Sequence, residues 1–329
     1  MQRQFTAIRL NINHSIHLGS HREEYDRSDS IMHSDSLYSA IIAAWAVLGV
    51  EHPVLESTAD QIPDLGFAIT SLFPFFRESA SAKPLYFFPI PQQRLNDADR
   101  IQFRGKKWMS TGVFIQYLKT GNLQGPKISG EFLTPYTVFN PKFMQNEAQP
   151  RAYVPRLNEE EIDTEIFYID RIFFAKHCGL FGLAIFNNDD IRDKVMLALD
   201  YLQDAGIGTD RNVGHGQFEF EMDAFNRFDD LPDSDYAMNL SMFLPERQVQ
   251  LVQMLDDQCS HDIVKRGGWI TTEGLLSYRK DSVYMFREGG VFKTKESVAG
   301  GTVNLRPSVL SHVDPILRVG RSVFLPVKI

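Results

Sequence analysis

The sequence has few cysteines and no long apolar run. Only Cys178 and Cys259 are present among 329 residues, and two isolated cysteines exclude a disulfide framework and a cysteine-rich zinc site. The longest apolar stretch, residues 40–50, is far shorter than the roughly 20 residues of a membrane helix, and no secretory apolar core follows the first residues. We therefore expect a cytoplasmic protein without a membrane partner, a metal site or a cofactor.

The composition is typical of a folded protein, because 43% of the residues are hydrophobic and 23% are charged. The net charge of −8 argues at first against a nucleic-acid partner, but the charge is unevenly distributed. Residues 100–156 carry nine basic and two acidic residues, and residues 263–329 carry eleven basic and five acidic residues. Residues 157–262, by contrast, hold seven basic and 23 acidic residues. Two basic blocks can form local phosphate-binding surfaces, and the acidic block is either a docking face for a partner or a solubilising face.

Aromatic residues alternate with the cations of the 100–156 block. They are Phe103, Trp108, Phe114, Tyr117, Phe132, Tyr136, Phe139, Phe143 and Tyr153. Cations for phosphates and aromatic faces for bases are what single-stranded nucleic acid requires of a protein. We therefore predict that this block binds RNA through Arg104, Lys106 and Lys107 and that some of its rings stack on bases. A solvated surface with uneven charge is the alternative.

Hydrophobic periodicity predicts an α+β protein. An alternating strand over residues 5–12 precedes a helix that runs from Ser34 or Asp35 to Gly49, and a second amphipathic helix spans residues 190–202. The acidic segment 229–233 predicts a domain boundary, which divides the chain into residues 1–230 and 231–329. Both parts begin strand, helix, strand. We therefore predict two ferredoxin-like (RRM-like, βαββαβ) units with antiparallel sheets, a long basic insertion at about 100–156, and an open sheet face for RNA.

A glycine-rich loop over residues 206–216 contains Gly206, Gly208, Gly214 and Gly216. Such glycines indicate backbone at positive φ, or a ligand that approaches the main chain closely. A dinucleotide-binding fingerprint is excluded, because Arg211 stands where a third glycine belongs and the loop follows a helix. A Walker loop is excluded, because no Gly-Lys-Ser/Thr follows. The loop is either a phosphate-binding turn, with its N–H groups and cation facing the ligand, or a tight turn between helix and strand.

The start of the first helix, residues 32–37, also allows two interpretations. Ser34 or Asp35 can simply cap the helix. Alternatively, the positive end of the helix dipole, with His33 as a nearby donor, suits an anion.

Together these segments resemble a CRISPR-associated RAMP protein. Residues 33–41 resemble the HSDTLFSAI helix start of the fourth subunit of the type III-A (Csm) effector complex, with Ser36 in place of the usual Thr. The glycine loop with Phe218 resembles the superfamily's GxGxxxxxGxGxF loop, and Ile169-Asp170-Arg171 resembles its IDR strand.

Two C-terminal segments extend the resemblance over nearly the whole chain. Residues 289–292 resemble the family's eGSvf segment, with Gly290 in place of the usual Ser, and residues 317–320 resemble its yRyG segment. Residues 121–155 match no segment of the family that we can place.

The resemblance implies a non-catalytic RNA-binding subunit in antiviral defence. Such a subunit holds the repeat-derived 5′ handle of the guide RNA (crRNA), indirectly meets target RNA, and contacts a backbone RAMP subunit. It also docks the large polymerase-like subunit that makes cyclic oligoadenylates. The basic block occupies the place of the family's thumb-like insertion. The implied RNA-binding residues are His33, Ser34, Arg171, Gly206, Gly208, Arg211, Asn212, Gly214, His215 and Gly216, with His33 and Ser34 near the glycine loop.

Two alternatives stay open from the residues themselves. Some RAMP relatives cut guide precursors without metal, and His14, His17, His21, His33 and His215 are candidate bases for such a ribonuclease. No fixed spacing supports this, and the His261-Asp262 pair lacks the helical context of a metal phosphohydrolase. A scaffold that touches only protein is the third possibility.

Overall fold

The computed structural model describes residues 4–19, 28–58, 62–92, 103–123, 125–135, 140–152, 166–209, 211–270, 274–275 and 277–329. Within them the chain is a mixed α+β protein in which antiparallel sheets predominate. Short 3-10 helices occur at Pro53–Glu56, Pro141–Phe143, Arg211–Val213 and Ser308–Leu310. Predictions for His21, Tyr136, Phe139, Tyr153 and the end of the basic block, residues 153–156, lie outside the described residues.

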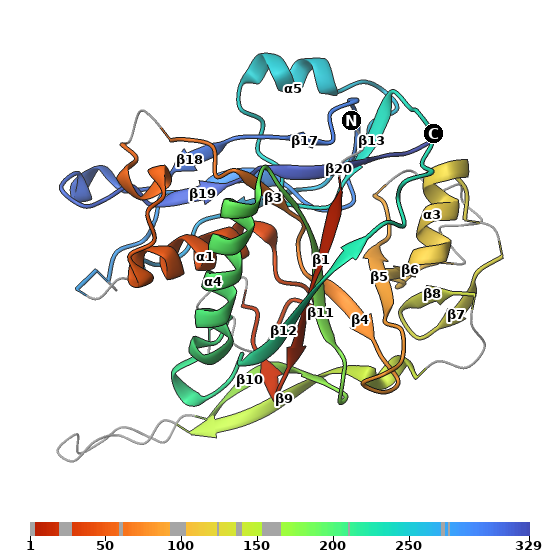
Figure 1. The fold of residues 1–329 in the computed structure, drawn as a ribbon, viewed down its shortest axis with the longest axis horizontal. Coiled ribbons are helices and arrows are strands. Elements are labelled where there is room, and N and C mark those ends of the chain that lie inside the picture. Colours follow the sequence, from red (N-terminus) through yellow and green to blue (C-terminus); the bar gives the residue numbers. More distant parts are fainter. Residues whose placement is uncertain are drawn as a thin grey trace.

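A nine-stranded sheet forms the centre of the molecule (Figure 1). Its strands are β1 (Phe5–Ile12), β3 (Phe67–Ile69), β4 (Phe73–Phe76), β5 (Leu85–Pro89), β6 (Trp108–Ser110), β7 (Lys127–Ser129), β8 (Phe132–Thr134), β11 (Gly179–Phe186) and β12 (Phe218–Phe225). The order is β12-β1-β11-β4-β5-β6-β8-β7, and β3 also pairs with β11. The β6–β8 pair is parallel, whereas β1 is antiparallel to both of its neighbours.

Two helices cover one face of this sheet. Helix α1 (Ser34–Leu48) ends at Gly49, whose φ of 64° is left-handed, as the sequence predicts. Helix α4 (Asp189–Ala205) begins after Asn188, whose side chain accepts a hydrogen bond from the Ile191 backbone. Both helices pack against one side of β1, where alternate residues are buried in the same apolar cluster as the helix side chains. Along the chain, β1, α1, β3, β11, α4 and β12 thus follow in the order strand, helix, strand, strand, helix, strand.

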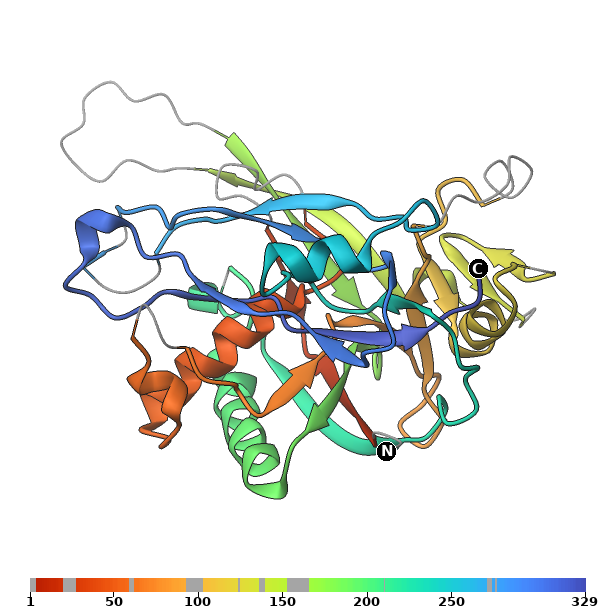
Figure 2. The ribbon, with the colours of Figure 1, turned by 90° about the horizontal axis from the view of Figure 1, so that it is seen from above.

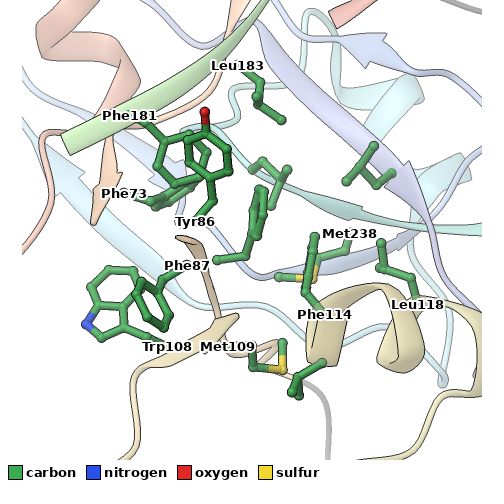
Figure 3. Close-up of a cluster of buried hydrophobic side chains, with 14 of the residues drawn as sticks. Phe73, Tyr86, Phe87, Trp108, Met109, Phe114, Leu118, Phe181, Leu183 and Met238 are labelled. Carbon is green, nitrogen blue, oxygen red and sulfur yellow. The ribbon is translucent and has the colours of Figure 1, made fainter. Parts of the chain in front are cut away.

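The opposite face of the sheet is covered, which contradicts the expectation of an open face. Phe181 of β11 lies against Tyr86, with 4.5 Å between ring centroids, and beside Phe73 (Figure 3). Helix α3 (Thr111–Thr120), which ends at Gly121, adds Phe114, whose ring stacks on Phe88 at 4.6 Å. The face that the helices leave free is therefore an aromatic core, not a platform for bases.

The described aromatic residues of the basic block belong to this core. Their side chains are at most 4% exposed: Phe103, Trp108, Phe114, Tyr117, Phe132 and Phe143. The prediction that rings of this block stack on bases is therefore wrong for these six. Alternating exposed cations and aromatic residues also arise when the aromatic members are buried and only the cations face water, so the sequence pattern does not distinguish the two cases. This part of the basic block contributes β6, β7 and β8 to the central sheet.

A small second sheet carries a projecting hairpin. It consists of β2 (Ser15–Ile16), β10 (Ile166–Phe174) and β9 (Met144–Ala152), in the order β2-β10-β9. Strands β9 and β10 pair over their whole lengths, from Met144 opposite Phe174 to Ala152 opposite Ile166. Figure 2 shows the far ends of both strands extending away from the body. The strand that the sequence predicts over residues 165–174 is thus one arm of this hairpin.

The C-terminal part contains three small sheets. One has the order β16-β13-β20-β17, and β14–β15 and β18–β19 form two-stranded ribbons. Their bounds are β13 (Tyr236–Asn239), β14 (Ile263–Arg266), β15 (Val283–Phe286), β16 (Val291–Lys293), β17 (Val298–Ala299), β18 (Thr302–Asn304), β19 (Leu317–Val319) and β20 (Ser322–Pro326). Among the described residues of this part the α-helix is α5 (Gln248–Met254), which starts three residues after Pro245. A second βαββαβ unit is therefore not confirmed.

The C-terminal part shares a core with the rest of the chain. Met238, Leu240 and Val323 belong to the same apolar cluster as Phe114 and Phe181. Backbone bonds also cross between the parts, for example from the Ser71 N–H to the Leu240 carbonyl at 3.0 Å. The boundary predicted at residue 230 remains a prediction, and residues on both sides of it pack together.

Candidate nucleic-acid interface

The glycine loop joins α4 to β12 and is anchored on the β1–β2 turn. Its two ends meet, because the Ile207 N–H donates to the Gly216 carbonyl at 2.9 Å. Two further bonds attach it to the turn: the Gly216 N–H donates to the Ser15 carbonyl at 2.9 Å, and the Thr209 N–H donates to the His17 carbonyl at 3.2 Å. The loop is therefore a fixed, closed turn beside β2.

Three of the four glycines are needed by the chain itself. Gly206, Gly208 and Gly216 have φ values of 77°, 91° and 78°, in the region where only glycine is unstrained. A Cβ atom would also approach a carbonyl oxygen to 2.9 Å at Gly206, 2.6 Å at Gly208 and 1.9 Å at Gly216. At Gly214, with φ of 82°, a Cβ atom would meet nothing within 4 Å. The close backbone approach that the sequence indicates is thus an approach of the chain to itself at three positions, while Gly214 faces open space.

The tip of the loop carries the exposed polar groups. Arg211 and Gly214 are exposed, and residues 211–213 form one 3-10 turn. His215 is half-buried, and its Nδ1 lies 2.9 Å from the Ser15 hydroxyl. Asn212 is placed in the turn by its backbone, and its side chain lies outside the described part of the structure. The loop therefore presents a cation, an imidazole and a glycine backbone on one small surface.

Arg171 and Asp170 hold the hairpin to the body. Arg171 is 1% exposed, and its guanidinium donates to the Gln149 amide oxygen across β9–β10 at 2.7 Å. The Asp170 carboxylate accepts from the Ser28 N–H at 2.9 Å and from the Asn146 side chain at 2.7 Å. The Asp170 carbonyl also contacts His17 Nδ1. Arg171 thus joins the two strands of the hairpin, and Asp170 joins the hairpin to the segments around His17 and Ser28.

His33 and Ser34 bind the C-terminal part of the chain. His33 is 6% exposed, and its Nδ1 lies 2.9 Å from the Glu288 carboxylate. Ser34 is fully buried, and its hydroxyl accepts from the Met242 N–H at 2.9 Å. Burial lowers the pKa of His33, but Glu288 and Asp29 outweigh this effect and raise it to about 9. We therefore assign these two residues no direct RNA contact in the proposal below.

Asp35 completes this junction instead of capping the helix. It is fully buried and accepts from Arg266 at 2.8 Å and from Arg318 at 2.7 Å. Burial alone would raise the pKa of Asp35, but the two guanidinium groups lower it to about 2. Arg318 is the arginine of the segment at 317–320 and Glu288 immediately precedes the segment at 289–292. Three separated sequence motifs therefore meet at one buried cluster, where they join α1 to the C-terminal part.

The three cations predicted in the basic block lie elsewhere. Arg104 is exposed, Lys106 donates to the Gly130 carbonyl at 2.7 Å, and Lys107 pairs with Glu131 at 2.9 Å. They belong to the β6–β8 region, which is one end of the central sheet and which Figure 1 shows on the right, away from α4 on the left. The structure does not bring them together with the glycine loop.

The projecting hairpin carries exposed residues that the sequence interpretation missed. Ile166, Phe167 and Tyr168 of β10 are 66%, 40% and 53% exposed. Arg151 of β9 stands directly opposite Phe167 and is also exposed. The available signal was an apolar run at the start of a strand that follows a long polar segment.

The described residues contain neither a metal-binding cluster of side chains nor a membrane-spanning helix. No group of three or more His, Cys, Asp or Glu residues in this part of the chain is arranged to hold a metal ion. Likewise, none of its helices combines the length and the apolar character needed to cross a membrane.

Comparisons with known proteins agree on one family. Residues 232–327 match the model of the CRISPR Csm4 C-terminal domain. Csm4 of Thermococcus onnurineus (strain NA1) is 24% identical over 264 residues, which cover 80% of this chain and 82% of that protein.

Solved structures give the same fold. A chain of the Csm3–Csm4 subcomplex of the type III-A interference complex matches with a TM-score of 0.67 and 15% identity, over 99% of this chain and all of that one. A chain of the Csm1–Csm4 cassette with cA4 matches with a TM-score of 0.59 and 17% identity, over 99% and 98% of the two chains. In its C-terminal domain, in a relative that matches over four fifths of its length and in its fold, the chain is therefore similar to Csm4.

Proposed function

We propose that this chain is a non-catalytic subunit of a type III-A (Csm) effector complex in the cytoplasm and that it holds the 5′ handle of the guide RNA. In this proposal the arrangement of β1, α1, β3, β11, α4 and β12 is one ferredoxin-like unit, because the order β12-β1-β11-β3 is all antiparallel. The observation that carries the proposal is the glycine loop, closed by the Ile207–Gly216 bond, with Arg211 and Gly214 exposed at its tip. Guanidinium groups such as that of Arg211 bind phosphates through charge-assisted hydrogen bonds.

The hairpin of β9 and β10 replaces residues 100–143 as the thumb in this proposal. Arg151 and Tyr168 are exposed, and in this proposal they contact a phosphate and a base. Stacking of a base on an aromatic side chain contributes about 1–3 kcal/mol. Asp170 contacts His17, whose carbonyl accepts from the Thr209 N–H of the glycine loop, so that an RNA bound at the loop tip continues toward the hairpin. We infer that the hairpin meets the guide beyond its handle, where target RNA pairs.

The ribonuclease alternative receives no support from the histidines. His33 has a pKa of about 9 because Glu288 and Asp29 stabilise its charged form, so at neutral pH it already carries the proton that a general base must accept. His17 is 2% exposed and its Nδ1 is occupied by a backbone carbonyl. His215 Nδ1 lies 2.9 Å from the Ser15 hydroxyl.

We further propose that the acidic face docks the large subunit. The outer side of α4 exposes Met196 and Leu197, which are 38% and 48% exposed. Together with Asp193, Asp200 and Phe220 they line a groove of about 330 Å³. An apolar floor flanked by carboxylates suits a basic segment that carries one apolar side chain. Reversal of both charges, D193K with D200K, is expected to reduce co-purification with the large subunit, and unchanged co-purification would refute this docking site.

RNA binding by the full chain tests the main proposal. Labelled RNA with an intact or a scrambled 5′ handle is titrated in EDTA at two salt concentrations, and products are resolved on a denaturing gel. We expect tighter binding of the intact handle without cleavage, and loss of that preference in Arg211→Ala. Lys295→Ala, an exposed cation on the C-terminal part, is the matched control. Cleavage in EDTA would assign the protein to the processing ribonucleases, and equal binding by wild type and Arg211→Ala would remove the glycine loop from the interface.

A further inference from the structure

The β14–β15 ribbon exposes an aromatic residue beside a cation. Lys265 and Tyr284 are directly opposite each other in the antiparallel register, so their side chains leave the ribbon on the same face. Tyr284 is 67% exposed and Lys265 is exposed as well. Ile263, two residues from Lys265 on the same face, is 51% exposed. On the other face Met285 is buried, so one side of the ribbon packs on the body and the other faces solvent.

Positive charge is concentrated around this ribbon. Arg279 is exposed, and its guanidinium lies 4.9 Å from the centre of the Trp269 ring. Burial lowers the pKa of Lys280 to about 8, and the neighbouring Arg318 adds to this effect. Arg287 follows β15 directly. Residues 263–329 as a whole carry eleven basic and five acidic residues, and this excess of cations favours an anionic ligand.

We propose that the exposed face of the β14–β15 ribbon is a second contact for single-stranded RNA, with a base stacked on Tyr284 and a phosphate paired with Lys265. The inference rests on the proposed function and extends it to the C-terminal part. The residue types are those that we first sought in the 100–156 block, where the described rings are buried. On the ribbon the ring and the cation are both accessible. A stacked base requires an exposed aromatic face, and single-stranded nucleic acid supplies bases together with phosphates.

The ribbon is connected to the glycine loop by a short series of contacts. Glu288, just after β15, binds His33, and the imidazole of His33 lies 3.6 Å from the Asp29 carboxylate. The Asp29 N–H donates to the Leu18 carbonyl at 2.9 Å. The carbonyl of His17, the residue before Leu18, accepts from the Thr209 N–H of the glycine loop. In Figure 2 the light-blue segment that includes β14 and β15 crosses the body on the side from which the β9–β10 hairpin projects. One RNA strand can therefore follow this side of the molecule.

The test measures affinity of the full chain for intact-handle and scrambled-handle RNA in two ribbon variants. Because stacking is tolerant of sequence, Tyr284→Ala is expected to weaken binding of both RNAs by the same factor, about tenfold, which corresponds to about 1.4 kcal/mol. Tyr284→Phe keeps the aromatic face and is expected to bind like wild type. Lys265→Gln is expected to reduce the salt slope by about 0.7, the value for one phosphate of a single strand. Tyr201→Ala, an exposed tyrosine of α4, is the control.

The outcomes separate this inference from the proposed function. If wild type discriminates the two handles while Tyr284→Ala and Lys265→Gln bind as wild type does, the ribbon contact is refuted and the glycine-loop proposal stands. If wild type binds neither RNA, both are refuted. If the ribbon variants bind RNA normally but lose a partner subunit during co-purification, the ribbon is a protein interface and the inference is wrong. Circular dichroism of each variant confirms that the altered binding does not come from unfolding.

Discussion

The buried ion cluster around Asp35 makes a quantitative prediction about stability. Asp35→Asn keeps the size of the side chain but removes its charge, so that Arg266 and Arg318 lose the carboxylate that both of them contact. Removing one partner of a buried ion pair costs about 3–5 kcal/mol, because the remaining charge stays buried without compensation. Two guanidinium groups share this carboxylate, and we therefore expect a loss near the upper end of that range. Such a loss is a large share of the about 5–15 kcal/mol that stabilises a typical domain.

Equilibrium unfolding in urea, followed by fluorescence, measures this loss. Asp189→Asn is the matched control, because it makes the same change of carboxylate to amide at the start of α4, where the Asp189 side chain is 85% exposed and pairs with Arg192. We expect the control to change the free energy of unfolding little, since exposed ion pairs contribute little. A loss below about 1 kcal/mol in Asp35→Asn would refute the reasoning that this cluster joins α1 to the C-terminal part.

Three further predictions concern the same junction, the glycine loop and the core. The pKa of His33 is raised to about 9 in the folded chain, so its ion pairs stabilise the fold fully below pH 6.5, its ordinary pKa, and this contribution is lost as the pH rises through 9. The urea midpoints of wild type and His33→Gln, measured over a pH series, should therefore converge above pH 9, and parallel curves would contradict the assignment. Gly216→Ala is expected to disrupt folding, because its Cβ would lie 1.9 Å from the Ile207 carbonyl oxygen. Gly214→Ala has open space around its Cβ and should fold with a smaller loss of stability, and thermal melts of the two variants check this order. Phe114→Ala should destabilise the chain by about 3–5 kcal/mol and leave the RNA affinity of the folded molecules unchanged. Weaker RNA binding without a loss of stability would instead show that this ring stacks on a base.

Local signals in the sequence were sufficient for the helices. Glycine at position 49 ends α1 as predicted, and alternation over residues 5–12 gives β1. These features depend on residues only a few positions apart, where the periodicity of burial and the φ preference of glycine act directly. The positive φ values that the glycines of the loop indicate are confirmed, and the group that approaches the backbone at three of them is the chain's own carbonyl.

The partners of the motif residues could not be predicted, because they are far apart in the chain. His33 meets Glu288 across 255 positions, and Asp35 meets Arg318 across 283. A serine or an aspartate before a helix is equally typical of a cap and of a buried junction, and only the tertiary structure distinguishes them. The prediction that aromatic residues of the 100–156 block stack on bases was wrong for a related reason, since composition does not tell whether a ring such as Trp108 faces solvent or the core.

The central claim is that the tip of the glycine loop holds the 5′ handle of a guide RNA. Photo-crosslinking tests it most directly: the full chain is bound to a handle RNA that carries a photoreactive base at each position in turn, and the crosslinked peptides are identified by mass spectrometry. We expect crosslinks within residues 206–216 for the intact handle, and the loss of these crosslinks with scrambled RNA. Crosslinks confined to the β6–β8 region around Arg104, with none in the loop, would contradict it.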